Sequence, residues 1–310
     1  MSMPKPKPVP YKATSADPDR AEEESVHQVY QAIAPHFAQT RHKPWPVVTR
    51  FINSLPSRSF GLDSGAGNGK YLAAANTAGH TMLSLDRSSG LLNLARHGSI
   101  NECIRADLGF QGWRRGVFDF TISIAAIHHL STPIRRRNAV RALIPPLKMS
   151  RCQPYARFLI YVWAYEQGAG SRRSMGTAIL SPTPMTSSSS KEKEQTRVDE
   201  EKVQDVLVPW VLQPPHPAPD SVRTDQKADA DRVETKVYHR YYHLFIEGEL
   251  RDLVCEAARE EDLVVIEGPI QPVIGPLHDQ GWLRIREEGW EADNWWLEAE
   301  VGFGPLGGMG

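Results

Sequence analysis

The chain has 310 residues, a formal net charge of −1 and 40% hydrophobic side chains. This length and composition provide enough apolar surface for a sizeable core, and the balanced charge excludes a protein that binds nucleic acid through an overall positive field. No apolar run approaches the roughly 20 residues of a membrane span, so we expect no membrane contact.

The first 24 residues are predicted to be a disordered leader. Proline alternates with lysine in "MSMPKPKPVPYK", and the charge run "ADPDRAEEE" that follows has no apolar period. No apolar segment typical of a secretory signal occurs in this leader. The cysteines Cys103, Cys152 and Cys255 are far apart and lack zinc-ligand spacing. We therefore expect no metal site and a cytoplasmic location, with the nucleus as a second one.

Residues 25–173 alternate between helical and strand patterns. Val26, Val29, Ile33 and Phe37 recur at helical spacing and predict a helix over 26–40. Strands are then predicted at 59–65, 81–88, 118–130 and 156–166, with a short one before Asp107. Helices are predicted at 70–79, 89–98 and 132–147.

Residues 174–235 are predicted to be a low-complexity insert, because Ser, Pro, Lys and Glu dominate them. One apolar island at 203–212, "VQDVLVPWVL", is expected to dock on the folded part. The core resumes over 236–310, with a helix at 241–260 and strands at 262–269 and 294–303. This alternation predicts an α/β fold with a mostly parallel sheet covered by helices on both faces.

The segment "GLDSGAGNGKYL" at 61–72 is a strand that leads into a glycine turn and a helix. Gly65, Gly67 and Gly69 permit a tight bend and a close backbone approach to a ligand, and the helix that follows presents free N–H groups. Taken alone, the three glycines fit an ordinary strand-to-helix turn equally well.

Acidic residues around the turn favour an adenosine ligand. Asp86 ends the next strand, where an acid accepts hydrogen bonds from ribose hydroxyls, and Asp107 follows the third strand. Asp63 would repel a pyrophosphate but can pair with an ammonium, so the ligand is interpreted as S-adenosylmethionine and not as a dinucleotide. The predicted cofactor-binding residues are Asp63, Gly65, Gly67, Asn68, Gly69, Asp86, Arg87 and Asp107.

Longer stretches make the similarity specific. "VHQVYQAIAPHFAQTRHKPWPVV", "DSGAGNGKYL", "FDFTISIAAIHHLST", "RFLIYVWAYEQ", "YHLFIEGEL" and "DNWWLEAEV" resemble the tRNA wobble-uridine (5-carboxymethyluridine) methyltransferases. That family includes a fungal enzyme and the methyltransferase domain of the animal AlkB-like tRNA enzyme.

The resemblance implies a fold, a reaction and partners. The fold is a Rossmann-like class I S-adenosylmethionine-dependent methyltransferase with a mostly parallel seven-stranded sheet. The reaction is methylation of the 5-carboxymethyluridine carboxylate at the tRNA wobble position, which forms the methyl ester. The partners are the tRNA anticodon loop and a small zinc-binding activator subunit that methyltransferases share.

The substrate side needs a cation more than a base, because a carboxylate with a pKa of about 4 is already ionised at neutral pH. Arg41 is the predicted cation, and His128, at the carboxyl end of the strand over 118–130, is predicted to act by position. Predicted contacts to the RNA are Lys43, Trp45, His129, Arg172 and Arg173. The alternatives are a solvated basic turn for 41–43, core packing for Trp45, and loop-carbonyl contacts for the histidines.

Two other functions remain open from the residues alone. One is a methyltransferase that acts on a small carboxylic acid or a protein. The other is a non-catalytic subunit with a methyltransferase fold. The three acids Asp63, Asp86 and Asp107 argue against the second, and the basic "TRHKPWP" loop argues against the first.

Overall fold

The computed structural model describes residues 6–13, 15–40, 43–97, 102–168, 171, 203–212, 236–266 and 279–304. Most of the insert predicted at 174–235 lies outside these ranges. None of the described helices combines the length and the apolar character that a membrane crossing requires.

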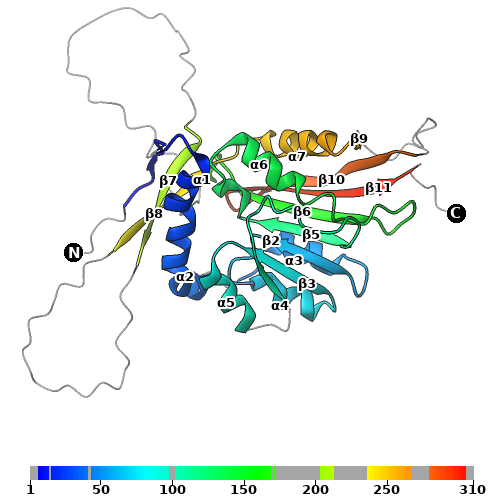
Figure 1. Ribbon diagram of the computed structural model, residues 1–310, viewed down its shortest axis with the longest axis horizontal. Coiled ribbons are helices and arrows are strands. Elements are labelled where there is room, and N and C mark those ends of the chain that lie inside the picture. Colours follow the sequence, from blue (N-terminus) through cyan, green and yellow to red (C-terminus); the bar gives the residue numbers. More distant parts are fainter. Residues whose placement is uncertain are drawn as a thin grey trace, which may run out of the picture.

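An eight-stranded sheet forms the centre of the molecule (Figure 1). Its spatial order is β4-β3-β2-β5-β6-β11-β10-β9, and among these strands only β11 runs against the others. The strands are β2 (Phe60–Ser64), β3 (Thr81–Asp86), β4 (Cys103–Arg105), β5 (Phe120–Ile124), β6 (Ala156–Trp163), β9 (Val264–Ile266), β10 (Gly281–Glu291) and β11 (Asn294–Phe303).

The expectation of a mostly parallel sheet is confirmed, with eight strands instead of seven. The additional strand is β10, whose sequence "GWLRIREEGWE" is too charged to indicate a buried strand. Its arginines form ion pairs across the sheet, because Arg284 pairs with Glu300 and Arg286 lies 2.9 Å from Glu298. Cross-strand charge pairs of this kind stabilise the hairpin with β11.

Helices cover both faces of the sheet (Figure 1). The pair α6 (Pro133–Arg141) and α7 (Glu249–Glu260) packs on one face, with a core that includes Phe158 and Ile160 of β6. On the opposite face, α3 (Pro46–Asn53), α4 (Lys70–Thr77) and α5 (Ser89–His97) enclose Phe120 and Tyr161. The strands between the helical layers are therefore buried, as a parallel sheet requires.

A smaller antiparallel sheet contains β1 (Val9–Pro10), β7 (Asp205–Val211) and β8 (Val237–His243) in the order β1-β7-β8. The predicted island at 203–212 lies in β7, which buries Val206, Val208 and Trp210 at alternate positions. The prediction of one helix over 241–260 is wrong in its first part. Tyr241–His243 continue β8, and α7 begins only after Gly248, whose φ of 84° breaks the chain direction.

The prediction of a disordered leader over 1–24 is wrong in two places, because Val9–Pro10 form β1, which pairs with β7, and because a helix begins at residue 18. The helix α1 (Pro18–Glu22) begins at Asp17, whose side chain accepts the N–H of Asp19, and it continues through a π-helical turn, η1 (Glu23–His27), into α2 (Gln28–Thr40). The segment has low hydrophobicity, but its acidic side chains form ion pairs that hold it on the folded protein.

The central ion pair of this segment joins Glu22 to α6. The Glu22 side chain is 1% exposed and lies 2.8 Å from Arg135, while Ser131 donates both its N–H and its hydroxyl to the Glu22 carboxylate. We expect Glu22→Ala to lower the free energy of unfolding by about 3 kcal/mol, because the change breaks a buried pair and leaves the Ser131 N–H without its acceptor.

Denaturant unfolding of the Glu22→Ala protein measures this loss. The matched control is Glu24→Ala, two residues along, whose side chain is 44% exposed and lies 3.2 Å from the exposed Arg20. That change should alter the free energy of unfolding by less than about 1 kcal/mol. Equal losses in the two variants would contradict the role given to Glu22.

Candidate functional site

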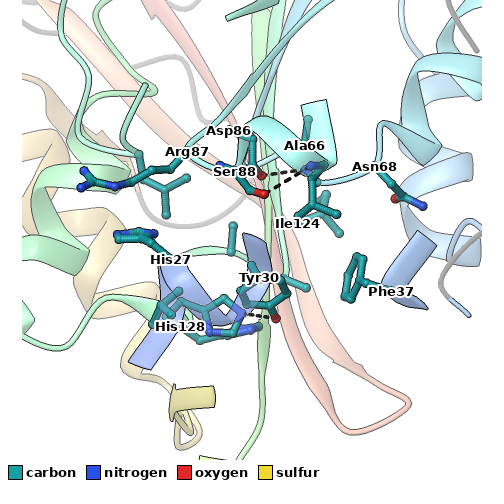
Figure 2. A pocket seen from close by; sticks show the side chains of 18 of the residues that line it. His27, Tyr30, Phe37, Ala66, Asn68, Asp86, Arg87, Ser88, Ile124 and His128 are labelled. Atoms are coloured by element: carbon teal, nitrogen blue, oxygen red, sulfur yellow. Dashed lines mark hydrogen bonds between the residues drawn. The ribbon is translucent and has the colours of Figure 1, made fainter. Parts of the chain in front are cut away.

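A cavity that is open to solvent lies at the carboxyl ends of the parallel strands. Open α/β sheets bind their ligands at this edge. The loops after β2, β3, β4 and β5 form one wall, and η1, α2 and β8 form the other. Figure 2 shows His27, Tyr30 and Phe37 on the second wall, opposite Ala66, Asn68 and Asp86.

The turn after β2 depends on its glycines. Gly65, Gly67 and Gly69 have φ values of 88°, 56° and 72°, which L side chains rarely adopt. A Cβ on Gly65 would lie 2.3 Å from the Ala126 Cβ, and one on Gly69 would lie 2.7 Å from the Ala95 Cβ. Both N–H groups at 65 and 66 donate to the carbonyl of Leu85, so the turn is fixed against β3.

Asp63, the last residue but one in β2, is a buried carboxylate that lacks a hydrogen-bond partner among the described residues. Burial, together with the nearby charge of Asp86, raises its pKa to about 8, although Lys70 opposes the shift. Asp63 is therefore largely protonated at pH 7. A cationic ligand group placed beside it would favour its ionised form.

Asp86 ends β3 and lines the cavity. Its carboxylate accepts the N–H groups of Gly67 and Ser88, each at 2.8 Å, which fixes its orientation (Figure 2). Burial raises its pKa, and these backbone donors oppose that rise. Each oxygen keeps a lone pair, so Asp86 can also accept ligand hydroxyl groups.

Six of the eight predicted cofactor residues line the cavity, while Asp63 and Gly69 lie in the strand and the turn next to it. Asn68 lines it from the turn, and Asp107 lines it beside the apolar Leu91 and Leu108. Arg87 spans the rim, where its guanidinium lies 3.0 Å from Glu23 and 3.4 Å from Asp107. The structure thus brings together all eight residues of the predicted set around one strand edge.

The two histidines after β5 differ in their surroundings. His128 is 1% exposed, and its Nδ1 accepts the N–H of Trp163, so a neutral ring carries its proton on Nε2. The His129 Nδ1 lies 2.8 Å from the carbonyl of Tyr241, to which it donates, and its Nε2 accepts the hydroxyl of Tyr30. Burial lowers the pKa of His129 to about 3, so this ring stays neutral.

Sequence reasoning missed the side chains that the second wall supplies. Tyr242 stacks on Trp163 with ring centroids 4.1 Å apart, and it stacks on His128 at 4.9 Å. Arg240 and Tyr30 complete this end of the cavity. The run "YHRYYH" at 238–243 carried a signal, because aromatic residues are enriched in strands.

The substrate residues predicted near 41–45 have different outcomes. Arg41 lies outside the described residues, as do Arg172 and Arg173, and Lys43 is exposed. Trp45 lines the cavity, but its ring also packs edge-on against Tyr161 at 4.1 Å. Its packing role is therefore part of the structure, and its contact with a base stays a prediction.

Comparison with known proteins gives the family context. A family model described as "Methyltransferase domain" matches residues 62–145. A Schizosaccharomyces pombe protein named tRNA (carboxymethyluridine(34)-5-O)-methyltransferase is 35% identical over 279 residues, which are 90% of this chain and 97% of that protein. A Saccharomyces cerevisiae protein of the same name is 34% identical over an aligned region that spans 90% of this chain and 96% of that protein.

Two solved structures share the fold. An S-adenosylmethionine-dependent methyltransferase from Clostridium acetobutylicum has a TM-score of 0.51 and 10% identity, and it covers 88% of this chain and 99% of its own. The 1,6-didemethyltoxoflavin-N1-methyltransferase of Burkholderia thailandensis, solved with S-adenosylhomocysteine, has a TM-score of 0.51 and 14% identity over 96% of this chain and 95% of its own. The chain therefore has the α/β fold of S-adenosylmethionine-dependent methyltransferases.

Proposed function

Because this chain belongs to the tRNA (carboxymethyluridine(34)-5-O)-methyltransferase family, we propose that it methylates the carboxylate of 5-carboxymethyluridine at the tRNA wobble position, with S-adenosylmethionine as methyl donor. The observation that carries this proposal is the extent of the match. The relatives align over nearly their whole lengths and across 90% of this chain.

The residues around the glycine turn fit the donor. The unpartnered carboxylate of Asp63 suits the ammonium of a methionine end, and Asp86 suits the two ribose hydroxyls. Leu91 and Leu108 supply apolar surface for an adenine ring beside Asp107. When bound, S-adenosylmethionine supplies a methyl group on a positively charged sulfur, and the carbon–sulfur bond breaks as a carboxylate oxygen bonds to that methyl.

The protein does not need a general base for this reaction, since the carboxylate is ionised before it binds. His129 is neutral, and both of its ring nitrogens contact protein groups. His128 turns its Nδ1 toward the backbone of Trp163 and is held between aromatic rings. Both histidines therefore contribute by shaping the cavity and orienting the substrate, and rate acceleration comes mainly from alignment.

The RNA contacts stay proposals. Trp45 lines the cavity at the start of α3, and Lys43 precedes it by two residues; an aromatic ring and a cation there suit a stacked base and a phosphate. Arg41, Arg172 and Arg173 would add phosphate or carboxylate contacts. The basic residues of α6 are less suited to RNA, because Arg135, Arg137 and Arg141 form ion pairs with acidic side chains of the same protein.

Nucleoside mass spectrometry of bulk tRNA tests the function in cells. Cells that lack the gene should lose the wobble methyl ester and accumulate 5-carboxymethyluridine, and the wild-type gene should restore the ester. A gene with Asp86→Ala should not restore it, because the loss of a charged hydrogen-bond acceptor weakens donor binding by roughly 1.5–3 kcal/mol. Unchanged ester in the deletion strain would contradict the proposed function.

A pH titration tests the role of Asp63. S-adenosylhomocysteine has the same amino acid end as the donor, and calorimetry can follow its affinity from pH 6 to 8. Since the free protein holds Asp63 protonated below its pKa of about 8, binding of an ammonium must release that proton. The affinity should then rise by up to tenfold per pH unit until about pH 8.

Asp63→Asn should remove this slope and weaken binding at pH 8, since an amide does not ionise. A wild-type affinity that does not change between pH 6 and 8 would show that Asp63 does not face the ammonium. The same slope in the Asp63→Asn protein would assign the titration to another group.

A small zinc-binding activator subunit is the proposed protein partner. The family resemblance is the reason to expect an activator that binds zinc. The sheet edge at β4 is the surface on which we expect it to bind. β4 pairs on one side with β3 and is an edge strand of the eight-stranded sheet, and α5 beside it exposes Leu94 by 38%. An uncovered strand edge next to apolar side chains invites association.

We expect co-expression with the activator to yield a stable complex and higher activity than the chain alone. Leu94→Glu should weaken co-purification, because a charge then faces the covered edge. The matched control is Ile134→Glu on α6, which is 61% exposed on the opposite face and should not affect the complex. Full activity from a monomeric chain without the activator would contradict this proposal.

A further inference from the structure

Arg240, in the middle of β8, is a buried cation that has no acidic partner among the described residues. The residue is 4% exposed, and no ion pair joins it to a carboxylate of the described residues. Its Nε has no hydrogen-bond partner in that part of the protein. A guanidinium stays charged at any accessible pH, so its burial without a counterion is unfavourable unless a ligand supplies the anion.

Aromatic rings hold this guanidinium in one place. The Arg240 Cζ lies 4.6 Å from the ring centre of Trp210, 5.2 Å from that of Tyr242 and 5.8 Å from that of Tyr30. Its Nη1 also donates to the Tyr30 hydroxyl at 3.3 Å, and that hydroxyl donates to His129. Cation–π contacts partly replace lost hydration without neutralising the charge. The cation is therefore preorganised and still able to attract an anion.

The position of Arg240 points to the substrate. It lines the same cavity as the glycine turn, at the end formed by His128, Trp163 and Tyr242. We infer that Arg240 binds the carboxylate of the 5-carboxymethyl group and so selects the acid form of the wobble uridine; this rests on the proposed function. Two parallel N–H groups hold a carboxylate through both oxygens, each of which keeps a lone pair for the incoming methyl.

The kinetic consequence follows from charge. Methylation turns the anionic carboxylate into a neutral ester, so the attraction of Arg240 is strongest for the substrate and weakest for the product. An interaction that is stronger in the ground state than in the transition state lowers KM without raising kcat. Arg240 is therefore expected to govern substrate choice and product release.

The sequence prediction gave this role to Arg41, which lies in the basic run before α3. Arg240 has the features that a carboxylate site needs within the described residues: burial, an unpartnered Nε and a fixed orientation. An experiment can separate the two arginines directly.

The experiment compares two synthetic anticodon stem-loops that differ only at the wobble base. One carries 5-carboxymethyluridine and the other carries 5-carbamoylmethyluridine, a neutral amide of the same shape. With the full chain and its activator, the wild type should bind the acid stem-loop roughly 10- to 100-fold more tightly than the amide. Arg240→Met should bring this ratio close to one, with unchanged affinity for S-adenosylhomocysteine and for the amide stem-loop.

Two further variants keep the test decisive. Arg240→Lys should retain part of the affinity ratio between the acid and the amide stem-loops, and it should raise KM more than it lowers kcat. If the Arg240→Met protein no longer binds S-adenosylhomocysteine, Arg240→Lys takes its place in the test. The matched control is Arg136→Met, since Arg136 is also 4% exposed and donates to a backbone carbonyl, that of Leu130, but is not among the side chains that line the cavity. This control should keep the wild-type ratio.

Three results would overturn the inference. One is a wild-type ratio in the Arg240 variants. Another is an equal loss of affinity for both stem-loops, which would assign Arg240 to an RNA phosphate. The third is loss of the ratio in Arg41→Met with the ratio kept in Arg240→Met. A wild-type protein that transfers no methyl to the acid stem-loop would instead refute the proposed function, and with it the ligand assigned to Arg240.

Discussion

A charge inside a protein is unfavourable unless a partner neutralises it. This constraint applies to two residues of this chain. Asp63 and Arg240 are both buried, and neither forms an ion pair with an oppositely charged side chain in the described ranges. Asp63 meets the constraint by staying protonated, which its raised pKa reflects. Arg240 cannot release its proton, so aromatic rings surround it. An ammonium on the donor and a carboxylate on the substrate would satisfy the two residues.

The fold places Arg240 in the cavity and Asp63 in the strand that leads to the cavity's glycine turn, by docking distant segments on a common sheet. The parallel strands present the glycine turn and the acids, and β8 brings Arg240 and Tyr242 to the opposite wall. Tyr30 connects the parts, because its hydroxyl contacts His129 and, at 3.2 Å, Tyr242. The amino-terminal helices are fastened in turn by Glu22 and Arg135. The positions of the substrate-side residues thus depend on long-range packing more than on their local sequence.

The cofactor side could be predicted from the sequence because its requirements are local. The positive φ values of Gly65, Gly67 and Gly69 need glycine, and an acid at the end of β3 is visible as Asp86. The other wall escaped prediction for physical reasons. The charged residues near Glu22 have the composition of a solvated segment, and only the structure shows that they form ion pairs. The sequence of β10 is too charged to indicate a strand, because its arginines pair with glutamates of β11. The aromatic run at 241–243 was assigned to a helix because the helical pattern of α7 begins only six residues later, after Gly248.

The central claim is that the chain forms a methyl ester, and the alkaline lability of the product tests it most directly. Purified chain with its activator is incubated with S-adenosylmethionine labelled in the methyl group and tRNA that carries 5-carboxymethyluridine. After removal of unreacted donor, mild alkali should release the label from the tRNA as methanol, because an ester hydrolyses under conditions that leave N-methyl, C-methyl and ribose O-methyl groups intact. Label that stays on the tRNA would contradict the account, since it would place the methyl on a base or sugar atom and leave the buried cation of Arg240 without its anion.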